Sequence, residues 1–295
     1  MLWKKPSRFG LLRAKLCRYI FTAELLQGAF RMIDKMGDRM KMYEGIEANR
    51  ILVPGLPICV RVDGRAFHSF TRGMERPYDI GMSNAMIETM KYLVNETDAL
   101  IGYVQSDEIS FVLSDVKEPL FGGRVSKLTS VIASVATVAF NREIAKYFPD
   151  KGMATFDCRV WNVPNRTEAA NTILWREFDA TKNSISMAAR SVYSHAQLKG
   201  KNGSEMQDML MSKGINWNDY PVFFKRGTYA RRETFEIKLP KDEIEKLPPK
   251  HECRANPEKP IIRSEIRLID MPIFSKVLNR EAVIFEGVAP KTAEI

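Results

Sequence analysis

The sequence has few cysteines and no long hydrophobic run. Its four cysteines are Cys17, Cys59, Cys158 and Cys253, and no C-x-x-C pair occurs among them. This spacing argues against a zinc cluster and against a disulfide framework, and it fits a reducing compartment. No run approaches the roughly eighteen apolar residues of a membrane-spanning helix, so we expect no membrane partner.

Basic charge is in excess, but most of it lies at one end of the chain. The 295 residues carry a net charge of +9, and residues 1–35 hold eight Lys or Arg against two acidic residues, so six of the nine net charges lie there. Global charge is therefore a weak argument for a nucleic-acid partner. The segment is interpreted as an organellar presequence, a surface helix or an artefact of start-site choice, because Met36 would be an ordinary start. We expect a cytoplasmic protein, or a mitochondrial one if the segment is a presequence.

Apolar periodicity predicts an α+β fold. The predicted strands cover residues 58–62, 100–104, 109–113 and 155–161, and the predicted helices between them cover residues 79–96 and 124–148. The order β-α-β-β-α-β is that of a ferredoxin-like sheet, as in a polymerase-type palm. A chain with 45% apolar residues is long enough to bury a core of this kind.

The chain is divided into a basic extension (1–36), a palm catalytic domain (37–162), a helical and hairpin region (163–240) and a peripheral C-terminal β or irregular segment (241–295). Three further expectations concern the third region. They are a helix over residues 167–193, a short helix to Met211 capped by Ser204, and a strand-pair turn over 221–229 that presents Lys225 and Arg226.

Three acidic residues at predicted strand ends are the candidate catalytic residues. Asp63 ends the first strand, and Asp107 and Glu108 open the third. In a ferredoxin-like sheet these strands are antiparallel central neighbours, so the two ends meet at one rim. Carboxylate oxygens favour magnesium over softer metals. The sequence therefore predicts a two-carboxylate magnesium site that handles nucleotide phosphates.

Several motifs, in this order, resemble the tRNA-His guanylyltransferase family, whose members add nucleotides in the 3′-to-5′ direction. They are Asp63-Gly64-Arg65-Ala66-Phe67-His68-Ser69-Phe70, Gln105-Ser106-Asp107-Glu108, Ser126-Lys127, Phe156-Asp157 with Arg159-Val160, Trp175-Arg176 and Lys225-Arg226-Gly227-Thr228. Where the tRNA-His enzymes carry His-Ile-Asn-Asn-Leu-Tyr-Asn, residues 181–187 of this chain keep only the first Asn, Asn183. This departure resembles the guanylyltransferase-like branch, which repairs truncated tRNA 5′ ends on the opposite strand as template.

The resemblance implies a mechanism and partners. Asp63, the backbone carbonyl of Gly64 and Asp107 would hold two magnesium ions, with Glu108 as a further acid. ATP or GTP would activate a 5′-monophosphate end, and the 3′-hydroxyl of an incoming nucleoside triphosphate would then attack that phosphate, with pyrophosphate or AMP as the leaving group. The implied partners are tRNA and nucleoside triphosphates, and the implied assembly is a homotetramer. The candidate nucleotide-binding residues are Arg65, Ala66, Phe67, His68, Arg76, Ser106, Arg124, Lys127, Asn183, Lys225 and Arg226.

Three alternatives stay open at this point. The first is a tRNA-His guanylyltransferase that adds the extra 5′ G. The second is a palm-type nucleotide cyclase, although a glycine pair usually precedes the acids there and this chain has Gln105-Ser106. The third is a non-catalytic RNA-binding module, which would place stacking aromatics on its central strands, where this chain offers Cys59 and Arg61.

Overall fold

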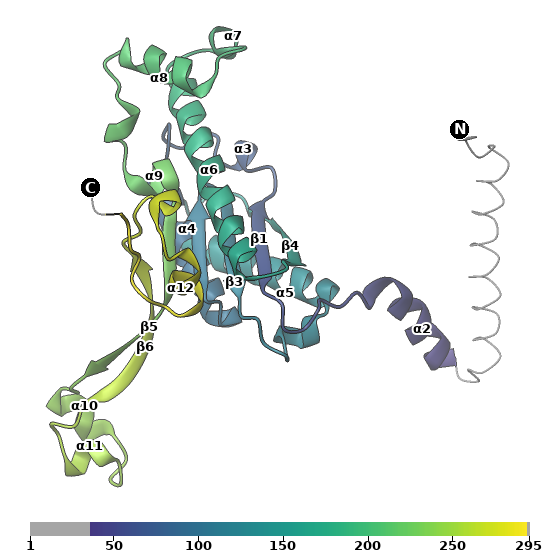
Figure 1. The fold of residues 1–295 in the computed structure, drawn as a ribbon, viewed down its shortest axis with the longest axis vertical. Coiled ribbons are helices and arrows are strands. Elements are labelled where there is room, and N and C mark those ends of the chain that lie inside the picture. The colour runs from purple at the N-terminus through teal and green to yellow at the C-terminus, as the bar shows by residue number, and fades with distance from the viewer. Residues whose placement is uncertain (1–35, 294–295) are drawn as a thin grey trace, which may run out of the picture. The chain divides into compact units, whose positions relative to one another are not determined.

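Figure 1 shows the fold in a computed structural model that describes residues 36–293. The chain forms two units, residues 1–50 and residues 51–295. In the first unit the structure describes helix α2 (Met36–Ala48). The basic segment 1–35, interpreted above as a presequence, a surface helix or a start-site artefact, lies outside the described residues. Among the described residues, no helix combines the length and the apolar character needed to cross a membrane.

An antiparallel sheet forms the centre of the second unit. Within residues 51–293 it has six strands in the order β4-β1-β3-β2-β5-β6. Their bounds are β1 (Ile58–Gly64), β2 (Ile101–Gln105), β3 (Glu108–Leu113), β4 (Phe156–Asn162), β5 (Thr228–Ile237) and β6 (Ile261–Ile269). The first four strands and the two helices between them confirm the predicted α+β palm, and β1 and β3 are antiparallel neighbours as expected.

Helices cover both faces of this sheet (Figure 1). On one face lie α4 (Ile80–Thr97) and α5 (Val125–Ile144); on the other lie α6 (Arg166–Arg190) and α12 (Arg280–Phe285). Side chains alternate along β1 in the same sense: Val60 and Val62 belong to the core beneath α4 and α5, whereas Cys59 belongs to the core beneath α6. Arg61 and Asp63 are therefore directed to the α6 face.

Short elements complete the second unit. They are α3 (Phe67–Phe70), η1 (Leu120–Gly123), α7 (His195–Leu198), α8 (Gly203–Met211), η2 (Trp217–Asp219), α9 (Val222–Arg226), α10 (Lys241–Lys246), α11 (Glu252–Ala255) and η3 (Phe274–Lys276). A third apolar cluster, which includes Ile185, Leu198, Leu210 and Phe224, joins the C-terminal half of α6 to α7, α8 and α9. This cluster extends α6 beyond the sheet and fixes one wall of the site described below.

Two local predictions were wrong. Residues 221–229 do not form the turn of a strand pair. Pro221 instead caps α9, whose Phe224 is 3% exposed in the third cluster, and β5 follows and pairs with β6. The helix ending at Met211 is capped by Asn202 rather than Ser204, because the Asn202 side chain accepts from the Glu205 amide at 3.0 Å.

Residues beyond 260 contribute to the sheet and to its core. Strand β6 pairs with β5 along nine residue pairs. Phe274, Val277, Val283 and Ile284 are buried in the same cluster as Cys59 and Tyr103. A stretch that the sequence analysis placed in the peripheral segment thus closes the apolar core under α6. Composition alone gave no sign of this, because the segment is rich in balanced charges and proline.

The packing of α4 on the sheet depends on Gly102. A Cβ atom there would lie 2.5 Å from Val94 Cγ2 and 2.8 Å from Met90 Sδ, both on α4. We expect Gly102→Ala to lower the free energy of unfolding by about 1–3 kcal/mol, because overpacking forces the helix away from the strand. Denaturant unfolding measures the change. Gly152→Ala is the control, because its Cβ would meet no atom of residues 36–293 within 4 Å. Equal stability of the two variants would contradict the prediction.

Candidate active site

The three predicted acids meet at one rim of the sheet. Asp63 at the end of β1 is paired in register with Glu108 at the start of β3. The Gly64 amide donates to the Asp107 carbonyl at 3.0 Å, which ties the β2–β3 turn to the end of β1. Ser106 in that turn has φ 54°, the left-handed geometry of a tight two-residue connection. The predicted convergence of these acids is therefore observed.

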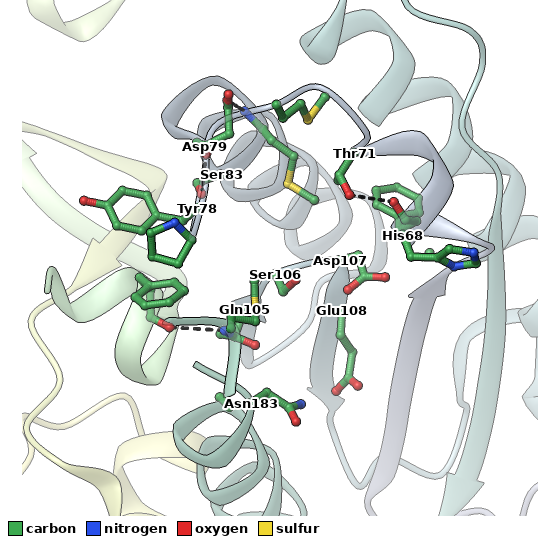
Figure 2. Close-up of a pocket in the computed structure, with 18 of the residues that line it drawn as sticks. His68, Thr71, Tyr78, Asp79, Ser83, Gln105, Ser106, Asp107, Glu108 and Asn183 are labelled. Atoms are coloured by element: carbon green, nitrogen blue, oxygen red, sulfur yellow. Dashed lines mark hydrogen bonds between the residues drawn. The ribbon is translucent and has the colours of Figure 1, made fainter. Parts of the chain in front are cut away.

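A cavity of about 750 Å³ opens beside the acids. Its walls come from the end of β1, α3, residues 74–83, the β2–β3 turn, α6 and α9 (Figure 2). The Asp107 and Glu108 carboxylates, the Ser106 hydroxyl and the Asn183 amide lie around it (Figure 2). The volume falls in the range of pockets that enclose small-molecule ligands or cofactors.

Gly64 is required by the close approach of Phe67. A Cβ at Gly64 would lie 2.2 Å from the Phe67 ring, a contact that no side chain can make. Phe67 is 3% exposed and packs with its ring centroid 5.1 Å from those of Phe70 and Phe156. Ala66, which lies between Gly64 and Phe67 in the sequence, has φ 55°. Aromatic packing thus holds the chain that carries Asp63 in a fixed conformation.

An arginine network holds Glu108. Arg61 Nη2 lies 2.7 Å from Glu108 Oε2 and 3.1 Å from Asp63 Oδ2. Arg176 on α6 donates to both Glu108 oxygens, with Nη2 2.7 Å from Oε2, and also donates to Asp179 at 2.7 Å. Because both Glu108 oxygens accept from arginine, this carboxylate acts as the anchor of the network. Asp107 makes no ion pair within residues 36–293.

The pKa values of Asp107 and Glu108 are both raised, and burial is the main cause. Burial raises the pKa of Asp107, and the neighbouring Asp63 charge raises it further. Burial also raises the pKa of Glu108, although the Arg176 and Arg61 guanidinium groups oppose that rise. The proximity of Asp63 and Asp107 therefore disfavours two negative charges at this rim, a cost that a bound cation would relieve.

These residues suit a cation that keeps part of its own coordination shell. In the described part of the chain, no group of three or more His, Cys, Asp or Glu side chains has metal-binding geometry. Asp63 and Asp107 supply two carboxylates. Magnesium is bound in this way, by one or two carboxylates together with water and substrate phosphates. The donor set fits magnesium and does not fit a zinc site.

The cavity gathers most of the residues predicted from sequence. Those that line it are Asp63, Gly64, Ala66, Phe67, His68, Arg76, Ser106, Asp107, Glu108 and Asn183. Phe67 contributes mainly to the core, as described above. Arg76, His68 and Asn183 are the exposed side chains among the polar residues predicted there.

Five predicted nucleotide-binding residues lie outside the cavity lining. Arg65 is exposed beside the site, and its amide donates to Thr155 O at 2.9 Å. Arg124 and Lys127 lie at the start of α5, and β3 runs away from the acids before that helix begins. The Lys225 ammonium donates to the Asn218 carbonyl, and the Arg226 carbonyl accepts from Tyr103 Oη at 2.9 Å. Contacts from these residues to a nucleotide stay a prediction.

Three arginines that line the cavity, Arg61, Arg176 and Arg190, were not among the predicted site residues, although Trp175-Arg176 is one of the motifs that carry the resemblance. A signal existed for Arg61, because residues two apart on a strand share a face and Arg61 precedes Asp63 by two. No local signal could join Arg176 to Glu108, since 68 residues separate them.

This geometry defines a class: a palm-type nucleotidyltransferase with paired acids at the rim of a nucleotide-sized cavity. The tRNAHis guanylyltransferase family model matches residues 37–164. The tRNA(His) guanylyltransferase of Schizosaccharomyces pombe is 32% identical over 213 residues, which cover 67% of this chain and 80% of that protein. The chain belongs to the tRNA(His) guanylyltransferase family, and it is a nucleotidyltransferase.

Solved structures agree with this assignment. A bacterial tRNA(His) guanylyltransferase-like protein in complex with ATP matches with a TM-score of 0.70 and 37% identity, covering 85% of this chain and 99% of that one. A bacterial guanylyltransferase-like protein in complex with GTP matches with a TM-score of 0.62 and 33% identity, covering 82% and 95%. The fold of the palm and the added helices is thus shared with proteins that bind nucleoside triphosphates.

The Arg176–Glu108 pair can be tested by stability. We expect Arg176→Met to lower the free energy of unfolding by about 3 kcal/mol, because a carboxylate with a 14% exposed side chain loses its two-pronged partner. Adding Glu108→Gln should restore part of the loss, since it removes a buried negative charge that Arg61 alone would then neutralise. Denaturant unfolding of the single and double variants measures the coupling.

The matched control is Lys182→Met on the same helix, where the side chain is 77% exposed. It should leave stability unchanged. A loss in this control equal to that of Arg176→Met would show that burial of the ion pair is not the cause.

Proposed function

We propose that this protein adds nucleotides to the 5′ end of tRNA with the help of bound magnesium. The observation that carries the proposal is the convergence of Asp63 and Asp107 at the rim of the cavity, in a chain of this family. Solved relatives bind ATP and GTP, which supports nucleoside triphosphates as substrates. The homotetramer implied by the resemblance stays a prediction.

The roles of the residues follow from their surroundings. Asp63, Asp107 and the Gly64 carbonyl would hold the magnesium, which when bound neutralises phosphate charge and favours ionisation of a hydroxyl. Glu108 keeps Arg61 and Arg176 in place, so it acts as a positioning residue. Arg76 and Arg190 line the cavity without an ion pair in the described residues and are suited to phosphate oxygens. The chain thus catalyses mainly by positioning and by electrostatic complementarity.

Two tRNA substrates are compatible with this site. Guanylation of tRNA-His is supported by the names of the curated relatives, which are tRNA(His) guanylyltransferases. Template-dependent 5′-end repair is supported by residues 181–187, where only Asn183 keeps the tRNA-His motif, and by the 37% identity to a guanylyltransferase-like protein. The names of the curated relatives favour guanylation, while the residue departure and the match to the guanylyltransferase-like protein favour repair.

The metal-site assignment is tested by Asp63→Asn and Asp107→Asn. We expect each to reduce nucleotide addition by about 10²-fold or more, because a fixed charge at the reacting phosphate is lost. Binding of tRNA, measured separately, should stay near the wild-type value. Asp98→Asn is the control, since Asp98 follows α4 at the end of β2 opposite to the acids and is 89% exposed. Retained addition by either site variant would reject the assignment.

The choice between the two substrates requires one comparison. Purified protein, magnesium and all four nucleoside triphosphates are offered to tRNAs that lack their first nucleotide and to tRNA-His without its extra G. Growth that follows the opposite strand supports repair, whereas guanine added to tRNA-His irrespective of the opposite base supports guanylation. Sequencing of the 5′ ends distinguishes the outcomes, and growth of neither substrate would contradict the proposed function.

A further inference from the structure

Trp175 is an exposed aromatic residue directly beside the catalytic rim. It lies on α6, is 47% exposed, and belongs to none of the apolar clusters of the described residues. Burial therefore gives no reason for a tryptophan at this position. A single exposed apolar residue is ordinary on a protein surface, but this indole lies against two arginines that line the substrate cavity.

The indole is held by the arginines of the site. The Arg176 guanidinium carbon lies 4.4 Å from the Trp175 ring centroid, and the Arg61 guanidinium carbon lies 6.0 Å from it. Both distances are within the range of cation–π attraction. Arg61 in turn contacts Asp63 and Glu108. The ring is thus fixed in place, one side chain away from the carboxylate proposed to hold magnesium.

The surroundings of the ring suit a nucleic acid. Two helical turns further along α6, Lys182 has a side chain that is 77% exposed. An exposed aromatic ring with cations beside it is an arrangement by which proteins bind unpaired nucleotides, since each nucleotide has a base face to stack and a backbone phosphate to neutralise. Trp175 also adjoins the cavity through Arg61 and Arg176, which line it.

We propose that the Trp175 indole stacks on the unpaired base of the tRNA acceptor end that lies opposite the addition site. This inference rests on the proposed function, which places the reacting 5′ phosphate at Asp63 and Asp107. Before a nucleotide is added, the opposite base has no pairing partner, so its ring is available for stacking. Trp175 is therefore a substrate-positioning residue, and its contribution is to tRNA affinity rather than to nucleotide affinity.

The test measures binding of a fluorescently labelled acceptor-stem minihelix to the full chain, without nucleotides and at fixed salt. We expect Trp175→Ala to bind about tenfold more weakly than wild type, the size of loss found when a stacked base loses its aromatic partner. Trp175→Phe should stay within about threefold, because a ring is kept. Phe178→Ala is the matched control: Phe178 is on the same helix and also 47% exposed, and its removal should not change affinity.

An abasic minihelix separates stacking from indirect effects. With the base opposite the addition site removed, wild type and Trp175→Ala should bind equally. If Trp175→Ala still loses affinity on the abasic minihelix, the indole acts only through the arginines and the proposal is overturned. A shift of oligomeric state in Trp175→Ala, measured by light scattering, would show instead that the ring contacts a second copy, and would also overturn it.

The same samples keep this proposal apart from the proposed function. Extension of the intact minihelix by wild type, with magnesium and nucleoside triphosphates, tests the function alone. If wild type extends it and Trp175→Ala binds as wild type does, only the stacking is rejected. If wild type extends no tRNA or minihelix, the proposed function is rejected whatever the binding data show.

Discussion

The antiparallel register of β1 against β3 is the constraint on which the active site depends. It pairs Asp63 with Glu108, and the next bond, from the Gly64 amide to the Asp107 carbonyl, closes the β2–β3 turn over the end of β1. Because side chains alternate along a strand, a slip of one residue would turn Asp63 toward the apolar core beneath α4 and α5. The burial of Val60 and Val62 in that core prevents such a slip, so the apolar pattern that folds the strand also positions the acid.

The charges at the rim have separate roles because arginine balances only one of the two adjacent acids. Glu108 is neutralised from within the chain by Arg61 and Arg176, whereas Asp107 has no ion pair in residues 36–293. The uncompensated charge is therefore that of Asp107, which lies beside an Asp63 that shares Arg61 with Glu108. The network is not optimised for stability, since Arg61 Nε is buried without a hydrogen-bond partner among the residues that the structure describes, which costs about 1–3 kcal/mol. A cluster of this kind is typical of a functional site rather than of a structural core.

The sequence predicted the features that depend on local pattern and on topology. Periodicity located the palm strands and the helix predicted over residues 79–96, where Asp79 is the N-cap of α4 and its side chain accepts from the Met82 amide at 2.9 Å. The predictions that were wrong or missing depend on contacts between residues that are far apart in the sequence. The burial of Phe224 turns residues 222–226 into a helix. The contact between Arg176 and Glu108 forms only when α6 packs across the sheet, so no spacing in the sequence could reveal it.

The topology that brings the acids together also determines which arginine and lysine side chains of the same chain lie near them. Strand β3 starts at the acids and runs away from them, so helix α5 begins beyond the opposite end of the sheet. Arg124 and Lys127, at that helix start, are therefore remote from the cavity of their own chain. Lys225 is only 8% exposed and its ammonium is engaged with the Asn218 carbonyl. Among the described residues, Arg76 and Arg190 are the arginines that line the cavity without an ion pair, and a triphosphate bound by this chain alone would depend on them for its phosphate contacts.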